Sequence, residues 1–351
     1  MSEGEVRSGR SETRPVHEAG SGGAAGPGAG PGTAGSWPAS GIAVVGGGVV
    51  ARALRAALGG GCVAVADAAA VIIAIPAGEF ANGPRSDLLD AVNETLDELR
   101  SAGRDPHVVL ISSAAVLGAS AARDVMDDDA PPADPDGTGS VLDRLLEAER
   151  LVTSAGLGRL SILRPAMLAG PGVDTICTRH LEAPRLLVAR GVTKDWQMLH
   201  VDDLVSAVAT VLDRGLLGSV TVGAVHPDGS PDVVGQDEVA GLVGLRTIAV
   251  PVETAFGMAD RLRRTGVVPS GSGDLAFVLF DWTVSSRRLL DAGWRPERST
   301  ADCLAEVAGS RPAGTTIGWR RVGSRDAAAV GAAGAAVAAL ATAVLVRRAR
   351  R

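Results

Sequence analysis

The sequence predicts an α/β protein whose core is a parallel sheet. Between residues 41 and 310, short apolar runs alternate with helical stretches, which is typical of this class. The first apolar run also leads directly into a glycine-rich turn and a helix. Hydrophobic residues make up 46% of the 351 residues, enough to bury a sizeable core. The formal net charge of −6 provides no basic field, so we expect no nucleic-acid partner.

Composition divides the chain into segments around this domain. Residues 1–40 are rich in Gly, Ser, Pro and Ala and show no apolar period, so we expect a disordered tail. Residues 41–310 are expected to form the α/β domain. Residues 311–326 contain several arginines and are interpreted as a linker.

A hydrophobic helix is predicted after that linker. Residues 327–346 carry no charge, and a rise of ~1.5 Å per residue takes them to about 30 Å, the thickness of a bilayer's hydrocarbon layer. The alternative is an alanine-rich helix that stays in water or packs on the domain. The basic tail 347–351 opposes a span with the domain in the cytosol. We predict a cytoplasmic domain associated with a membrane through this helix, with a soluble cytoplasmic protein as the alternative.

The start of the domain has the pattern of a dinucleotide-binding turn. Ile42–Val45 forms an apolar run, and a helix is expected from Arg52. Between them, Gly46 permits a tight turn, Gly48 lets the backbone approach a pyrophosphate, and the small Ala51 allows helix and strand to pack closely. The amide groups at the helix N-terminus would then hold the phosphates. The alternative is a plain strand–helix turn.

The next acid in the pattern is Asp67, which follows a second apolar run at 62–66. In a dinucleotide-binding fold an acid near this position binds the adenosine ribose. A further apolar run begins at once, at 71–75, although parallel neighbours need a crossover of about a dozen residues. We infer that the adenosine-side edge of the sheet has been cut away. Asp67 is therefore either a ribose ligand or a loop acid that leads into the next strand.

Several short motifs, in the correct order, resemble one known family. They are Asn93, the strand and serine loop 105–118, Leu163-Arg164-Pro165 with Gly170-Pro171, the His-Val-Asp-Asp segment within 196–204, and Ala292-Gly293-Trp294-Arg295-Pro296 after Ser286-Arg287. Together these motifs resemble the NAD-dependent epimerase/dehydratase family, the extended short-chain dehydrogenase/reductases. The resemblance covers roughly residues 41–310.

The resemblance implies a Rossmann-type, doubly wound parallel sheet with a smaller C-terminal substrate-binding part, mainly residues 165–200 and 225–310. It also implies bound NAD or NADP and a nucleotide sugar or similar small molecule as substrate. A homodimer is one option that the sequence leaves open. In this family a Ser or Thr orients the substrate, a Tyr moves its hydroxyl proton, and a Lys lowers the pKa of the Tyr.

This chain lacks the central part of that machinery. It has no tyrosine, and its single lysine, Lys194, lies outside the expected position. Ser113 matches the family serine. The tyrosine and lysine positions fall on Val141 and Leu145 in one alignment register.

In a register shifted by one residue, the two positions fall on Ser140 and Arg144. Neither register supplies a phenol, and arginine does not deprotonate. Arg144 is a candidate for hydrogen bonding to the hydroxyls of a cofactor ribose; the alternative is a solvated arginine on a helix.

A loop in the expected substrate part groups three cationic candidates. Arg179, His180 and Arg185 would suit a phosphate clamp, and the alternative is a solvated loop. His200 is a candidate base, although the family's His-Val-Asp-Asp segment is structural. We expect His107 and Lys194 to be exposed.

The remaining patterns are less specific. The acidic run 127–129 is interpreted as a solvated flap, and no metal site is predicted. The thiols Cys62, Cys177 and Cys303 lie too far apart for a ligand motif and are interpreted as buried or incidental.

Three hypotheses follow for the function. The chain is a degenerate family member that binds NAD or NADP and serves as a sensor, scaffold or partner subunit. Alternatively, it is an active oxidoreductase or epimerase that uses substitute residues, with Ser113 orienting the substrate. In the third hypothesis it is an interaction module that has kept only the fold.

Overall fold

A five-stranded parallel sheet lies at the centre of the fold, with its strands in the order β1-β2-β3-β4-β9. These strands are β1 (Ile42–Gly46), β2 (Ala70–Ala74), β3 (His107–Ile111), β4 (Leu160–Pro165) and β9 (Gly218–Val222). The structure is a computed structural model, and it describes residues 37, 41–75, 87–122, 124–137, 139–264, 272–310, 315–317 and 320–322. Every residue of β2 and β3 is buried, as expected for parallel strands that are covered on both faces.

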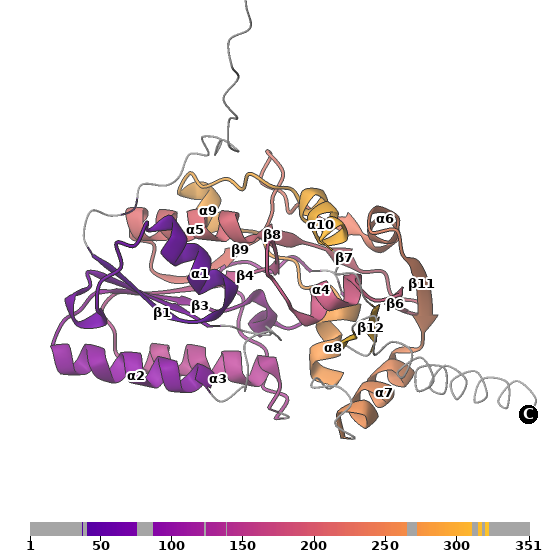
Figure 1. Cartoon of the computed structure of the whole chain (residues 1–351), viewed down its shortest axis with the longest axis horizontal. Coiled ribbons are helices and arrows are strands. Elements are labelled where there is room, and N and C mark those ends of the chain that lie inside the picture. Colours follow the sequence, from indigo (N-terminus) through magenta and orange to yellow (C-terminus); the bar gives the residue numbers. More distant parts are fainter. Residues whose placement is uncertain are drawn as a thin grey trace, which may run out of the picture. The chain divides into compact units, whose positions relative to one another are not determined.

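Helices cover both faces of this sheet (Figure 1). On one face lie α1 (Gly48–Ala57), α5 (Val201–Arg214) and α9 (Arg287–Asp291), which share a core cluster with the strands. On the other face, α2 (Asp87–Ala102) and α3 (Val141–Ser154) close a second cluster. The predicted doubly wound α/β fold is confirmed.

The sheet ends at β1, where the usual fold would continue. Cys62 makes only an isolated bridge to Ile42, and the Val63 amide donates to the Ile42 carbonyl at 3.0 Å. The chain then turns through the short 3-10 helix Val65–Asp67 and enters β2. The predicted loss of the adenosine-side edge is therefore confirmed, and the apolar run 62–66 forms no strand of the sheet.

A second group of elements surrounds its own core cluster. It contains α4 (Ile176–Leu181), α6 (Gln236–Leu242), α7 (Val252–Arg264), α8 (Ser272–Leu279) and α10 (Thr300–Gly309). Its strands form three pairs: β5 (Met167–Ala169) with β8 (Met198–His200), β6 (Arg185–Ala189) with β11 (Arg246–Val250), and β7 (Asp195–Trp196) with β10 (Val234–Gly235). These elements come from the segments that the resemblance assigns to substrate binding.

The structure tests the predictions for the two ends of the chain only in part. Trp37, inside the predicted tail, packs against the first core cluster. The predicted linker contains two short antiparallel strands, β12 (Thr315–Ile317) and β13 (Arg320–Val322). The hydrophobic segment 327–346 and the basic tail lie outside the described residues. Within the described residues, no helix combines the length and apolar character that crossing a membrane requires.

Candidate functional site

The turn between β1 and α1 has the geometry of an anion-binding loop. Gly46 has φ +96°, and a β-carbon there would lie 2.2 Å from the Ala74 carbonyl oxygen, so only glycine fits. Gly47 is the N-cap of α1 and provides no side chain to cap the helix, and Gly48 has φ +82°. Ala51 is fully buried in the core, as predicted. Gly47 therefore provides no side-chain cap at the N-terminus of α1, and helix N-termini favour anions.

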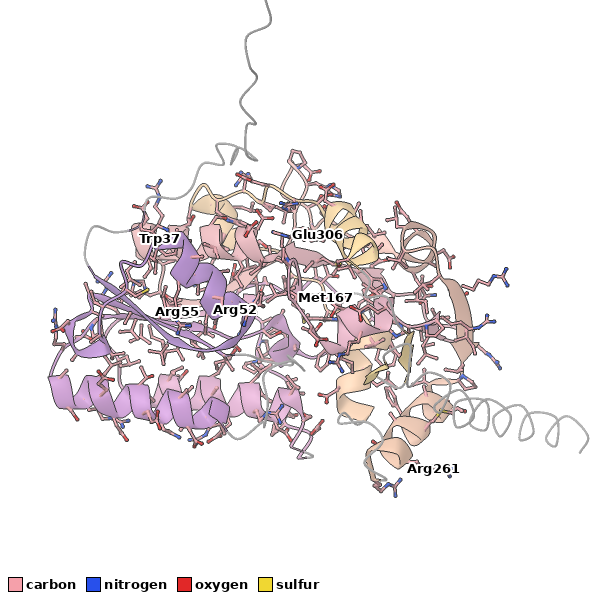
Figure 2. All side chains as sticks on the ribbon, in the orientation of Figure 1. Trp37, Arg52, Arg55, Met167, Arg261 and Glu306 are labelled. Atoms are coloured by element: carbon pink, nitrogen blue, oxygen red, sulfur yellow. The ribbon has the colours of Figure 1, made fainter. Side chains whose placement is uncertain are left out.

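Two arginines lie on α1, and one of them, Arg55, contacts the glycine loop; no motif in the sequence indicated either residue (Figure 2). The Arg55 Nη2 donates to the carbonyl oxygens of Val44 and Gly46, both at 2.9 Å. The Arg52 Nη2 lies 3.7 Å from the place of a β-carbon on Gly172. Both arginine side chains are exposed. Arg55 thus brings positive charge to the glycine loop, whereas Arg52 lies near Gly172.

Asp67 does not join the glycine loop. It ends the 3-10 helix that precedes β2, and the Ala69 amide two residues later donates to the carbonyl of Gly41, just before β1 begins. Asp67 therefore lies near the amino ends of β1 and β2, whereas Gly46 lies at their carboxyl ends. This placement fits a loop acid and not a ribose ligand beside the loop.

Ser113 follows β3 at the carboxyl end of the sheet. It caps the short 3-10 helix Ala114–Leu117, and its Oγ accepts a hydrogen bond from the Ala115 amide at 3.2 Å. The side chain is half-buried. The Ser113 hydroxyl proton is not used in this bond and is able to donate to a ligand.

In the first alignment register, the two positions expected for Tyr and Lys lie in apolar packing. Leu145 is 1% exposed and Val141 packs beside it, on the first turns of α3. We call their surroundings the Leu145 cluster, which consists of Ala115, Val116, Leu142, Leu145 and Phe277. Neither side chain can move a proton, so this alignment register contains no acid–base pair.

The alignment register shifted by one residue also supplies no acid–base pair. Ser140 is the N-cap of α3, and its Oγ accepts a hydrogen bond from the Asp143 amide at 3.2 Å. Arg144 is half-buried and its Nη1 donates to the Gly139 carbonyl at 3.2 Å. Both side chains therefore organise the start of α3.

A buried ion pair fastens α3 to β4. Arg164 donates from Nε and Nη2 to the two carboxylate oxygens of Glu149, at 3.2 and 2.8 Å. Its Nη1 also donates to the Ala130 carbonyl at 3.3 Å. The two side chains are only 5% and 7% exposed. Arg164 belongs to the Leu-Arg-Pro motif, so this motif acts here as a structural anchor.

The three candidates for a phosphate clamp do not converge. Arg179 forms a two-bond ion pair with Asp174, at 2.6 and 2.9 Å. His180 is buried and stacks on Trp196, with ring centroids 6.0 Å apart. Burial lowers the pKa of His180 to about 3, so the ring is neutral near pH 7. Arg185 is exposed at the start of β6. This arrangement supports packing and not a clamp.

Lys194 is buried, contrary to the expected surface position. Its Nζ donates to the Phe277 carbonyl at 3.2 Å and to the Phe280 carbonyl, at the C-terminal end of α8. It also lies 5.0 Å from the centre of the Trp196 ring. Burial lowers the pKa of Lys194 to about 8. The only lysine of the chain is thus a helix cap.

The acidic run 127–129 is also more than a solvated flap. Asp128 is buried, and its Oδ1 accepts hydrogen bonds from the amide and the hydroxyl of Thr221, at 2.7 and 3.0 Å. Its Oδ2 accepts from the Arg288 amide at 3.1 Å. Asp128 therefore ties this loop to β9 and to the start of α9. Within the described part of the chain, no cluster of metal-ligating residues occurs.

The His-Val-Asp-Asp segment makes structural contacts. The His200 Nδ1 caps α5 by accepting from the Asp202 amide at 3.2 Å, and its Nε2 lies 3.2 Å from Glu306. Asp203 accepts hydrogen bonds from the amides of Glu297 and Arg298. These bonds join α5 to the loop after Trp294. His200 is therefore placed as a cap, in agreement with the structural interpretation.

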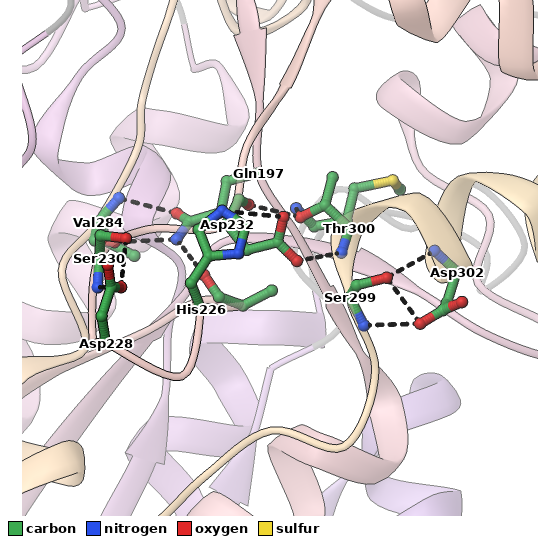
Figure 3. A network of polar contacts seen from close by, with 11 residues as sticks. Gln197, His226, Asp228, Ser230, Asp232, Val284, Ser299, Thr300 and Asp302 are labelled. Atoms are coloured by element: carbon green, nitrogen blue, oxygen red, sulfur yellow. Dashed lines mark hydrogen bonds and ion pairs between the residues drawn. The ribbon is translucent and has the colours of Figure 1, made fainter.

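A polar network connects residues around β7 and β8 with the start of α10 (Figure 3). The Gln197 side chain donates to the carbonyls of Ala224 and Val284, and accepts from the Val284 amide at 2.8 Å. The Asp232 carboxylate accepts a hydrogen bond from the Thr300 amide at 2.9 Å, and the Asp232 backbone carbonyl accepts one from the Thr300 hydroxyl at 2.7 Å. These bonds are local scaffolding around β7 and β8.

The buried histidines make stability depend on pH. His107 is buried, contrary to expectation, with its Nε2 2.7 Å from the Ser161 Oγ, and burial lowers its pKa to about 4. Between pH 6.5 and about 4 the unfolded chain binds a proton that folded His107 does not, so stability falls as pH falls; the full loss is roughly 3 kcal/mol. His180 acts in the same direction, whereas burial raises the pKa of Asp203, which opposes the trend.

Urea denaturation across this pH range tests the effect. The His107→Gln variant should lose stability less steeply than the parent chain. Replacement of His226, whose side chain is 52% exposed, should leave the slope unchanged and serves as the matched control. An unaltered slope in His107→Gln would contradict the assignment.

Comparisons with known proteins place this geometry in context. No family model matches the sequence. An uncharacterised protein of Mycobacterium tuberculosis (strain ATCC 25618 / H37Rv) is 27% identical over 235 residues, which are 64% of this chain and 60% of the relative. An uncharacterised protein of Mycobacterium bovis matches to the same extent. The chain therefore spans 60% of the length of these curated relatives.

Solved structures share the fold at low sequence identity. The human epimerase family protein SDR39U1, solved with NADPH, has a TM-score of 0.52 and 17% identity, over 77% of this chain and 99% of that one. MoeE5, in complex with UDP-glucose and NAD, has a TM-score of 0.54 and 20% identity, over 77% and 97% of the two chains. RMD from Pseudomonas aeruginosa, complexed with NADPH, has a TM-score of 0.51 and 20% identity, over 77% and 98%. These likenesses show the fold: the chain has a Rossmann-type α/β fold, which it shares with these solved structures.

Proposed function

We propose that the chain binds a nicotinamide dinucleotide at the loop from Gly46 to Ala51 and does not use a Tyr–Lys proton relay. It would act as a sensor, scaffold or partner subunit that responds to the cofactor or to a nucleotide-sugar-like ligand. The observation that carries this proposal is a contrast between two parts of the domain. The glycine turn is intact, whereas apolar packing surrounds Leu145, one of the positions that the first alignment register gives to the Tyr–Lys pair.

The residues present fit the phosphate part of such a cofactor. Gly47 provides no side-chain cap at the N-terminus of α1, and Arg55 brings positive charge to Gly46. Phosphate oxygens are favoured by both features. The fold neighbours solved with NAD or NADPH support the same ligand class. When bound, the nicotinamide ring supplies hydride transfer, and Ser113 is placed to donate a hydrogen bond to a ligand.

Gly47→Asp gives a direct test of binding. The backbone of Gly47 is extended, with φ −128°, and a β-carbon there meets no atom within 4 Å, so the fold should tolerate a side chain. Aspartate is a favoured N-cap and should keep or raise the melting temperature. Its carboxylate would occupy the amides and repel phosphate, so the affinity for NADH should fall at least about tenfold. Nicotinamide fluorescence during titration measures this.

Gly47→Ala is the matched control, because it adds a β-carbon without charge and should keep most of the affinity. If the parent chain shows no fluorescence change at millimolar NADH or NADPH, the binding proposal fails and the fold-only hypothesis gains. The catalytic alternative requires hydride exchange with nucleotide sugars above background, and that exchange should fall in Ser113→Ala. Such a result would replace the degenerate interpretation with an active one.

A further inference from the structure

The open edge of β1 determines what faces the adenosine side of the glycine loop. In the usual arrangement a second strand lies along this edge and ends in an acid that binds the 2′-hydroxyl of the adenosine ribose. Here the sheet stops at β1, and only Cys62 retains a bridge, at Ile42. Asp67, the acid with the right spacing in sequence, lies at the opposite ends of the strands. The described chain places no carboxylate of this kind at the loop.

Arg55 takes the place of the missing strand. Its Nη2 donates at 2.9 Å to the carbonyls of Val44 and Gly46, two residues apart on the same edge of β1. A neighbouring strand would ordinarily satisfy such alternate carbonyls. The guanidinium therefore closes the edge beside Gly46 and brings a permanent positive charge to that end of the strand.

The remaining hydrogen-bond donors of Arg55 suit an anionic ligand. Both protons of Nη2 serve the two carbonyls, which leaves the protons of Nε and Nη1. The side chain is exposed, and neither Arg55 nor Arg52 forms an ion pair among the residues that the structure describes. The first turn of α1 also contains no acid. An additional phosphate near this edge would meet the Arg55 guanidinium and no described competing carboxylate.

We infer that Arg55 makes this site selective for the 2′-phosphorylated cofactor, NADP(H), over NAD(H). The inference rests on the proposed function, since it concerns the adenosine end of the same ligand. An acid at the strand end favours a free ribose 2′-hydroxyl, whereas an arginine accommodates a 2′-phosphate. Substitution of a cationic side chain for the acid-bearing strand reverses the usual preference for NAD. Arg55 is thus a specificity-determining residue for cofactor choice.

Parallel titrations of the full chain with NADPH and NADH, followed by nicotinamide fluorescence, test the inference. We expect NADPH to bind at least about tenfold more tightly, the effect of one charge-assisted contact to phosphate. In Arg55→Gln that ratio should fall toward one, mainly through weaker NADPH binding. Arg55→Lys should keep part of the preference. Arg246→Gln removes the same charge from an exposed position on β11 and should leave the ratio unchanged.

A competition experiment needs no variant and covers the case in which Arg55→Gln fails to fold. The probes 2′,5′-ADP and 5′-ADP differ only in the 2′-phosphate, so 2′,5′-ADP should displace NADPH from the parent chain at a lower concentration. Equal affinities for NADPH and NADH, or equal displacement by the two probes, would overturn the inference and leave the proposed function standing. If neither cofactor binds, both the inference and the proposed function are contradicted.

Discussion

Replacing Glu149 by glutamine is expected to destabilise the folded chain by about 3–5 kcal/mol, because Arg164 would be left as a buried cation without its counter-charge. The pair is bidentate and almost wholly excluded from water. The Ala130 carbonyl remains as a partner for Arg164 but carries no full charge. Urea denaturation at pH 7 measures the free energy of unfolding. The same variant should also loosen α3, since the pair fastens this helix to β4.

The matched control is the double variant Glu149→Leu, Arg164→Met. Removing both charges avoids an uncompensated ion, so the double variant should be considerably more stable than Glu149→Gln. The ion pair Arg150–Glu147 lies on the exposed side of the same helix, and Glu147→Gln should cost less than about 1 kcal/mol. A loss in Glu149→Gln as small as that in Glu147→Gln would show that water reaches Arg164.

Local patterns in the sequence were sufficient to predict the fold and its glycine-rich turn. The alternation of apolar runs with helices predicted the parallel sheet, and the glycines from Gly46 predicted the turn before α1. The close spacing of the runs at 62–66 and 71–75 predicted the reduced edge, because a parallel crossover does not fit between them. Each of these signals depends on neighbours along the chain, which a single sequence displays directly.

Contacts between residues far apart in the sequence could not be predicted from local patterns. Lys194 and His107 were expected at the surface because charged and titratable residues usually lie there. Their burial depends on partners far along the chain, the Phe277 carbonyl for Lys194 and the Ser161 hydroxyl for His107. The cationic residues of the predicted clamp were grouped by spacing alone, yet Asp174 already pairs Arg179. No pattern in the sequence singled out Arg55, because its bonds to β1 depend on the absence of a neighbouring strand.

Introducing a lysine at Leu145 tests whether the place of the relay is closed. Leu145 is 1% exposed among apolar side chains, so an ammonium group there would lose its water without gaining a partner. We expect Leu145→Lys to lower the free energy of unfolding by roughly 3–5 kcal/mol at pH 7, in the range for an uncompensated buried charge. Val141→Tyr combined with this change should not create turnover, since the chain would first have to open the cluster.

The pH dependence distinguishes a buried lysine from a general packing defect. Burial would depress the pKa of the new lysine below its unfolded value, so its destabilising effect should be largest near pH 7 and should shrink as pH rises toward about 10.4. Leu145→Met, an uncharged replacement of similar size, should cost less than about 1.5 kcal/mol at every pH. Arg144→Lys controls for the presence of a lysine on the same turn. If Leu145→Lys is as stable at pH 7 as Arg144→Lys, the ammonium reaches water, the cluster is not closed, and a substituted Tyr–Lys pair becomes a chemically reasonable route to activity.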